Sequence, residues 1–225
     1  MYDLRSISYL IELVHPPMQH DLQKLQEFYN ELSKPPLTLY QNFNVAPGGA
    51  QISNAAIGAG AASTLTITGD RIQILEQRTP VDPEEFARRA VQIVELAQRH
   101  LNYQVFMPIQ YVVRTLINPH TTHDTRRLVG RQMCNLSADT LESIGREPNL
   151  FGIRLVFPQD DTSNSIFNVR VESYNTDHRS LFIENAGIFP TPLPAGEPER
   201  LAEGFNATYT FIRDNLARMV RNFDQ

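Results

Sequence analysis

Two histidine–aspartate pairs, His20-Asp21 and His123-Asp124, have the clearest potential for chemistry in this sequence. Another histidine, His120, lies three positions before the second pair, and imidazole and carboxylate groups are good ligands for transition metals. His120, His123 and Asp124 therefore form a candidate metal site, which pseudo-symmetry would extend with the first pair. The other interpretation is that each aspartate caps a helix, where its carboxylate accepts N–H hydrogen bonds at the positive end of the helix dipole. We favour capping, because it explains why the pair occurs twice.

Other familiar catalytic and nucleotide-binding patterns do not occur in the sequence. A serine hydrolase would carry its nucleophile in a Gly-x-Ser-x-Gly turn, which is missing. The single cysteine, Cys134, has no neighbouring base, which favours a packed thiol over a nucleophile. The glycine-rich stretch 46–62 lacks the Lys-Ser/Thr ending of a P-loop and the third glycine of a dinucleotide fingerprint, so it predicts a hairpin tip or flap. We expect no cofactor.

Helices that would position these residues have clear starts. The run Asp82-Pro83-Glu84-Glu85 combines a capping acid, a proline at the first helical position and glutamates in the first turn. Apolar residues at spacings of three and four continue from it to Leu101, which predicts one amphipathic helix. The same spacing over 201–220 predicts a C-terminal helix broad enough to lie across a sheet.

Two further helical segments are less regular. Apolar spacing over 22–32 predicts a helix that ends before Pro35-Pro36, because the paired rings prevent its continuation. A third helix would contain Cys134, but the apolar period slips directly after it. We therefore expect a separate short helix that is capped by Ser137 and ends at Gly145.

Alternating polar and apolar residues predict a sheet with one dry face. Residues 166–174 show the pattern best, since Phe167, Val169 and Val171 alternate with polar neighbours. Short turns such as 68–70 and 175–177 favour antiparallel pairs. The fold class we predict is α+β: a two-layer sandwich of a largely antiparallel curved sheet with helices on one face. Besides the first strands of each half, strands are expected at 37–45, 51–54, 63–68, 71–77, 151–157, 166–174 and 179–184.

The chain also reads as one motif used twice. Residues 7–11 match residues 109–113 at an offset of 102, and the pair His20-Asp21 then matches His123-Asp124. The helix that begins at Pro83 matches the one that begins at Pro198, so the offset grows to 115, as insertions into a duplicated unit would make it. We predict two α+β repeats, 1–104 and 105–225, which form one unit about a pseudo-twofold axis.

Composition narrows the classes of partner. The chain has 225 residues, 41% of them hydrophobic, and it contains no apolar run near the roughly 20 residues that cross a bilayer. Its net charge is −5, and the densest basic group, Arg126, Arg127 and Arg131, is typical of a solvated surface, so a nucleic-acid partner is not expected. The first residues lack the order of a secretory signal, which together with the single cysteine favours the cytoplasm.

The order of elements resembles a sporadically distributed family of small uncharacterised bacterial proteins. The likeness rests on 12–17, Arg71-Ile-Gln-Ile-Leu75 with the capped helix after it, 112–118, Ile153-Arg-Leu-Val-Phe157 and Phe205 in the last helix. It spans nearly the whole chain, which departs from the family in its histidines at 120–124. The resemblance supplies no catalytic residue and implies at most an accessory or defence-like role.

These observations predict a non-enzymatic binding or assembly module. Its groove between the halves, or an exposed sheet edge, would hold a protein partner or a small ligand, and a homo-oligomer fits a unit that already mimics a dimer. The alternative is a metal-dependent hydrolase centred on His120, His123 and Asp124.

Overall fold

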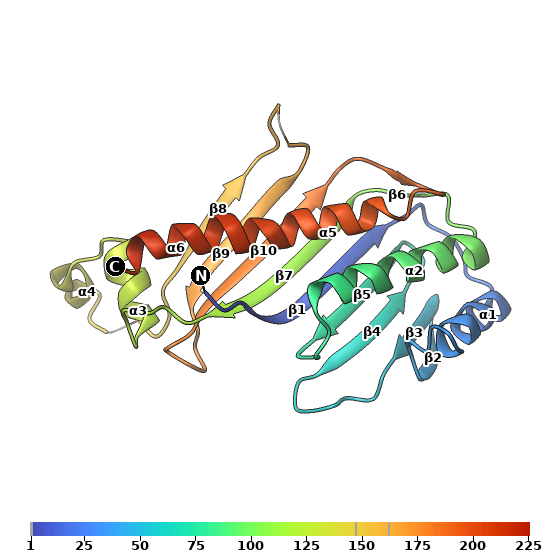
Figure 1. The fold of residues 1–225 in the computed structure, drawn as a ribbon, viewed down its shortest axis with the longest axis horizontal. Helices are drawn as coiled ribbons and strands as arrows, with labels where there is room; N and C mark the ends of the chain where they lie inside the picture. The colour runs from blue at the N-terminus through green and yellow to red at the C-terminus, as the bar shows by residue number, and fades with distance from the viewer. Residues whose placement is uncertain (1, 147, 162) are drawn as a thin grey trace.

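The larger layer of the structure is an antiparallel sheet (Figure 1). The computed structural model describes residues 2–146, 148–161 and 163–225, and within them nine strands join in the order β2-β3-β4-β5-β1-β7-β10-β9-β8. The strands are β1 (Arg5–Val14), β2 (Asn42–Ala46), β3 (Gly49–Ser53), β4 (Ala62–Ile67), β5 (Arg71–Gln77), β7 (Ile109–Ile117), β8 (Gly152–Phe157), β9 (Ile166–Ser173) and β10 (Leu181–Phe189).

Helices on one face of the sheet form the second layer. Figure 1 shows α2 (Pro83–Leu101) and a long C-terminal helix on the same side of the strands. The C-terminal helix consists of α5 (Arg200–Thr210), a π-helical turn η2 (Phe211–Leu216) and α6 (Ala217–Phe223), while α1 (Leu22–Ser33) packs beside α2. The predicted α+β class with an antiparallel sheet is therefore confirmed. The smaller elements are β6 (Val105–Phe106), which pairs with β11 (Leu193–Pro194), and α3 (Thr125–Arg127), η1 (Leu128–Met133) and α4 (Ala138–Ser143).

The predicted helix caps are present. The carboxylate of Asp21 accepts a hydrogen bond from the N–H of Gln23 at the start of α1, and Asp82 accepts one from Glu85 at the start of α2, both at 2.8 Å. Asp124 caps α3 in the same way. Both histidine–aspartate pairs therefore lie at helix starts, as the capping interpretation predicts.

The core fills the space between the sheet and the helices. On central strand β1, Tyr9 contacts Phe86 of α2 at 5.1 Å and Phe205 of α5 at 5.5 Å between ring centroids. The two phenylalanine rings are themselves 5.0 Å apart, so both helices meet over this strand. All three rings are buried, and burial of such a side chain contributes on the order of 1.5–3 kcal/mol.

The chain takes the same course on both sides of the central β1–β7 pair. Within the large sheet, the first strand of each half (β1 or β7) lies at the centre, the last strand (β5 or β10) lies beside it, and a long helix comes later in the chain. This order is compatible with the two predicted repeats, 1–104 and 105–225. The duplication and the boundary between the repeats stay predictions.

The face of the sheet opposite the helices carries a ladder of charges. Glu184 of β10 pairs with Arg114 of β7 at 2.6 Å and with Arg170 of β9 at 3.3 Å. Arg170 pairs further with Glu172 at 2.9 Å. The alternation predicted for residues 166–174 therefore separates buried apolar residues from this polar face. Among the described residues, no helix is long and apolar enough to cross a membrane.

Two strand boundaries differ from the prediction. Residues 37–41 are not part of a strand, because Thr38 has a φ of 47° and the N–H of Leu39 donates to the carbonyl of Leu32, which ties the segment to the end of α1. The predicted strand 179–184 runs instead from Leu181 to Phe189 as β10. Asn185 breaks its apolar alternation, but it is buried and donates to the carbonyl of Thr208 at 3.0 Å.

The third helix is also corrected. Cys134 does not lie within a helix: it follows the π-helical turn η1, and its N–H donates to the carbonyl of Val129. Asn135, with a φ of 52°, then turns the chain away. The short helix after it is confirmed as α4, since the hydroxyl of Ser137 accepts from Thr140 at 3.1 Å and Gly145 has a φ of 78°.

Candidate functional site

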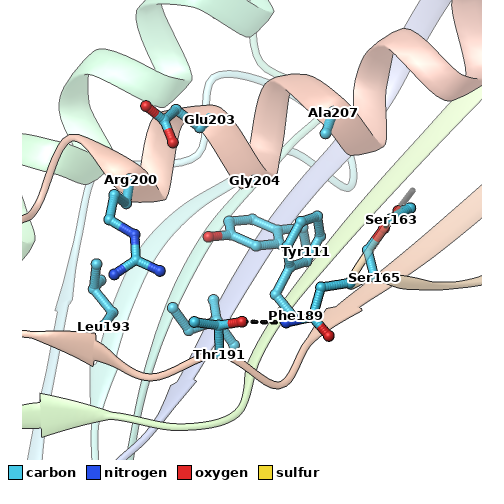
Figure 2. A pocket seen from close by; sticks show the side chains of 12 residues that line it. Tyr111, Ser163, Ser165, Phe189, Thr191, Leu193, Arg200, Glu203, Gly204 and Ala207 are labelled. Atoms are coloured by element: carbon cyan, nitrogen blue, oxygen red, sulfur yellow. Dashed lines mark hydrogen bonds between the residues drawn. The ribbon is translucent and has the colours of Figure 1, made fainter. Parts of the chain in front are cut away.

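A pocket of about 360 Å³ opens beneath the first turns of α5 (Figure 2). Its floor comes from β7 and the end of β10, and its sides come from the residues before β9 and the segment that leads from β10 to β11. It is lined by Ile109, Tyr111, Ser163, Asn164, Ser165, Phe189, Thr191, Leu193, Arg200, Glu203, Gly204 and Ala207. The lining combines an apolar floor with several polar groups, as small-molecule sites commonly do.

Tyr111 is the central polar residue of this pocket. Its side chain points from β7 toward the helices, and the residue is only 1% exposed. Figure 2 shows its hydroxyl directed to the space between Arg200 and Thr191. Among the described residues, nothing forms a hydrogen bond with this hydroxyl. Burial raises the pKa of Tyr111, with a smaller opposing effect from Arg200, so the phenol is a neutral hydrogen-bond donor.

Gly204 allows α5 to lie directly over Tyr111. A Cβ atom at this position would come within 2.6 Å of the tyrosine hydroxyl, so any other residue would push the helix and the ring apart. On its other side the ring meets Phe189 edge-on, with centroids 5.1 Å apart. The hydroxyl is therefore held in position by the backbone above it and by an aromatic side chain beside it.

Arg200 and Thr191 add further donors. Arg200 uses Nη1 to bind the carboxylate of Glu197 at 2.8 Å and the carbonyl of Pro192 at 3.3 Å. Its Nε and Nη2 donate to no group in the described part of the chain. Thr191 accepts a hydrogen bond from the amide of Asn164, which leaves its own hydroxyl proton free for a ligand.

The remaining lining gives the pocket an acid and an apolar wall. Glu203 lies one turn along α5 from Arg200, is exposed, and forms no ion pair with a described residue. The hydroxyls of Ser163 and Ser165 bind each other at 2.7 Å. The apolar wall consists of Ile109, Phe189, Leu193 and Ala207.

The predicted metal-site residues lie elsewhere. His120 is exposed and stacks on Tyr2 at 5.0 Å, and His123 is exposed. The carboxylate of Asp124 binds the guanidinium of Arg126 at 2.9 Å, and this partner lowers the pKa of Asp124. In the described part of the chain, no three or more His, Cys, Asp and Glu side chains are grouped so that they could hold a metal ion. Metal binding at His120, His123 and Asp124 stays a prediction.

His20 of the first pair and His15 form a separate cluster with Tyr103. His20 contacts the carbonyl of Thr68 at 2.8 Å and packs against Tyr103, whose ring also lies 4.5 Å from that of His15. His15 is itself buried, with only 3% of its surface exposed. Desolvation lowers the pKa of His15, which favours its neutral form.

Sequence reasoning did not find the residues of the Tyr111 pocket. Tyr111 and Arg200 each fit an ordinary strand or helix pattern, and the segments that meet here are far apart in the chain. One signal was present: Gly204 interrupts a well-patterned helix at a cost of about 1 kcal/mol relative to alanine, which indicates a close approach of another group.

Comparison with known proteins gives no independent assignment, since no protein-family model matches the chain and no curated protein matches its sequence. The resemblance to a bacterial family therefore stays a prediction, and the geometry of the pocket is the basis for a functional proposal.

Proposed function

We propose that this protein is a non-enzymatic binding module that holds a small polar ligand in the Tyr111 pocket. The observation that carries the proposal is the hydroxyl of Tyr111, which opens into the pocket and has no hydrogen-bond partner among the described residues. A ligand acceptor at this point would replace water on the hydroxyl, and one such neutral hydrogen bond contributes about 0.5–1.5 kcal/mol. We also propose that the protein acts in the cytoplasm, as its single cysteine favours.

Binding fits the lining better than catalysis does. No histidine or cysteine is among the lining residues, and the two serine hydroxyls bind each other, not a base. A nucleophile needs an adjacent base to become reactive at neutral pH. The donors around Tyr111 are suited to holding a fixed acceptor group.

The test is a fragment screen by NMR on the full chain, with Tyr111→Phe as the pocket variant. We expect hits whose chemical-shift changes centre on the pocket and whose affinity falls about five- to tenfold in the variant, because one neutral hydrogen bond is lost. Tyr174→Phe is the matched control, since this half-buried tyrosine directly follows β9 and lies outside the pocket lining. A screen without any hit in the pocket would refute the proposal.

Self-association through the edge strand β8 is a second candidate. Val156 is 57% exposed and Phe157 37% exposed, and β8 pairs with β9 alone among the described strands. A second copy fits this edge, because antiparallel pairing centred on Leu155 would place Arg154 opposite Val156 and so avoid facing arginines.

Light scattering during size-exclusion chromatography tests this assembly. We expect a dimer for the natural sequence and a monomer for Val156→Lys. Val45→Lys is the control, because Val45 is 56% exposed on β2, the opposite edge of the sheet. A natural chain that stays monomeric at every concentration would exclude the assembly.

A further inference from the structure

We infer that the ligand of the Tyr111 pocket is a small monocarboxylate with a compact apolar body. This inference rests on the binding function proposed above and names the chemical class of the ligand. It follows from two properties of the lining: a single cation on the same side of α5 as the Tyr111 hydroxyl, and an apolar wall.

Arg200 supplies the cation. Its Nη1 donates to the carboxylate of Glu197 at 2.8 Å and to the carbonyl of Pro192 at 3.3 Å, and these two contacts hold the guanidinium in place. The other guanidinium nitrogens, Nε and Nη2, have no partner in the described part of the chain. Figure 2 shows the guanidinium below α5, on the side where the Tyr111 hydroxyl lies. The pocket therefore has unsatisfied donors from two elements, α5 and β7.

The cation outweighs the nearby acid at the hydroxyl. Burial raises the pKa of Tyr111, the charge of Arg200 opposes this rise, and the charge of Glu203 adds to it by a smaller amount. Figure 2 shows why the acid acts more weakly: the Glu203 carboxylate projects from the opposite side of α5. The phenol therefore stays protonated and donates its hydrogen bond next to a positive charge, which favours an anionic acceptor.

The charges match one negative charge on the ligand. Among the described lining residues Arg200 is the only cation, and Glu197 already compensates part of its charge. A dianion would leave a charge unpaired beside apolar side chains, and a cation would be repelled by Arg200. A neutral amide would offer the donors a single oxygen, whereas a carboxylate offers two and matches the planar fork of arginine.

The apolar wall favours a carbon skeleton for the rest of the ligand. Ile109 and Leu193 are 3% and 2% exposed, so packing fixes their positions, and Phe189 meets the Tyr111 ring edge-on. An apolar body against this wall would keep water away from the carboxylate and the guanidinium, and a drier surrounding strengthens their attraction. The volume of about 360 Å³ is at the small end of the range for small-molecule sites, which favours a short branched chain or a single ring.

NMR titration of the full chain with matched probes tests the inference. The carboxylates 4-methylpentanoate and 3-phenylpropanoate are each compared with their own amide, which has the same shape without the charge. Acetate has the charge without the apolar body, and inorganic phosphate is a more highly charged anion. We expect the better carboxylate to bind about five- to tenfold tighter than its amide, because hydrogen bonds to ionised groups are roughly twice as strong as neutral ones. Acetate should bind at least about tenfold more weakly, since it buries little apolar surface.

Two variants separate the contacts. In Arg200→Gln the preference for the carboxylate over its amide should shrink to about twofold or less, because the guanidinium distinguishes the two probes. In Tyr111→Phe both probes should weaken, since the hydroxyl can donate to either. The Arg200 side chain is 39% exposed, so circular dichroism should show an intact fold. Arg218→Gln is the matched control: it removes the same charge from the exposed face of α6, outside the lining, and should leave the preference unchanged.

The possible failures are distinguishable. The inference is overturned if the amides or acetate bind as tightly as the better carboxylate, if phosphate binds more tightly, or if the preference persists in Arg200→Gln. It is also overturned if neither carboxylate binds while neutral fragments that depend on Tyr111 do, and the binding function would then stand with another class of ligand. If neither the probes nor any fragment occupies the pocket, the proposed function itself is wrong.

Discussion

Asp224 is expected to be one of the most important single residues for stability. Its carboxylate accepts hydrogen bonds from the hydroxyl of Tyr2 at 2.7 Å, from the backbone N–H groups of His120 at 2.6 Å and Thr121 at 2.9 Å, and from the hydroxyl of Thr121. These bonds join the residues before β1, the loop after β7 and the end of α6. The residue is 8% exposed, so water competes little for the carboxylate.

The size of the effect follows from the pKa of Asp224. Burial alone would raise it, but the hydrogen bonds outweigh burial and lower it from 3.8 to about 2. A shift of this size corresponds to about 2.4 kcal/mol of stability that depends on the ionised carboxylate. Asp224→Asn removes the charge and turns an NH2 group toward backbone donors, so we expect it to lose about 2–3 kcal/mol at pH 7.

The effect should depend on pH with a defined sign. A carboxyl whose pKa is lowered by folding stabilises the protein above its unfolded pKa of about 3.8, and this stabilisation is lost as the pH falls toward 2. Urea unfolding at a series of pH values measures it. The difference between the natural chain and Asp224→Asn should be full above about pH 5 and should shrink steadily below pH 4.

A control separates this effect from general acid sensitivity. Asp139 lies exposed on α4, and Asp139→Asn should change stability by less than about 0.5 kcal/mol at every pH. The reasoning is refuted if Asp224→Asn costs as little as this control at pH 7, or if its cost does not change with pH.

Two further changes test the packing of the helices and the charges of the open sheet face. Gly204→Ala should destabilise the protein by about 1–3 kcal/mol in urea unfolding, although alanine favours helices, because its methyl group would collide with Tyr111; a neutral or stabilising result would show that α5 lies further from the ring. Glu184→Gln removes two ion pairs, with Arg114 and Arg170, and should cost about 1 kcal/mol at low salt. That cost should decrease at high salt, and one that salt does not change would mean that packing, not charge, is the cause.

Local signals in the sequence were sufficient for most helix starts and strands. The caps Asp21, Asp82 and Ser137 act on groups two or three residues away, so a short segment contains all the information that defines them. Alternation of polar and apolar residues likewise identified 166–174 as a strand. The prediction of a strand at 37–41 was wrong because the backbone of this segment is bound to the end of α1, which no pattern within the segment reveals.

The pocket and the Asp224 contacts could not be predicted in this way. Tyr111 meets Gly204 only because β7 and α5 pack with a particular register, and Asp224 meets Tyr2 across nearly the whole length of the chain. The histidine–aspartate pairs drew attention because their residue types are reactive, but both aspartates act as caps. A lone tyrosine on a strand carries no comparable signal.

The meeting of α2 and α5 over Tyr9 has a consequence for how the chain folds. Strand β1 lies at the middle of the sheet, and its Tyr9 packs against Phe86 of α2 and against Phe205, which comes nearly 200 residues later in the chain. During synthesis this strand therefore emerges long before its second neighbour β7 and its last packing partner α5, and α2 alone can cover Tyr9 until α5 has been made. We expect such late closure to make the nascent chain dependent on chaperones and slow to mature.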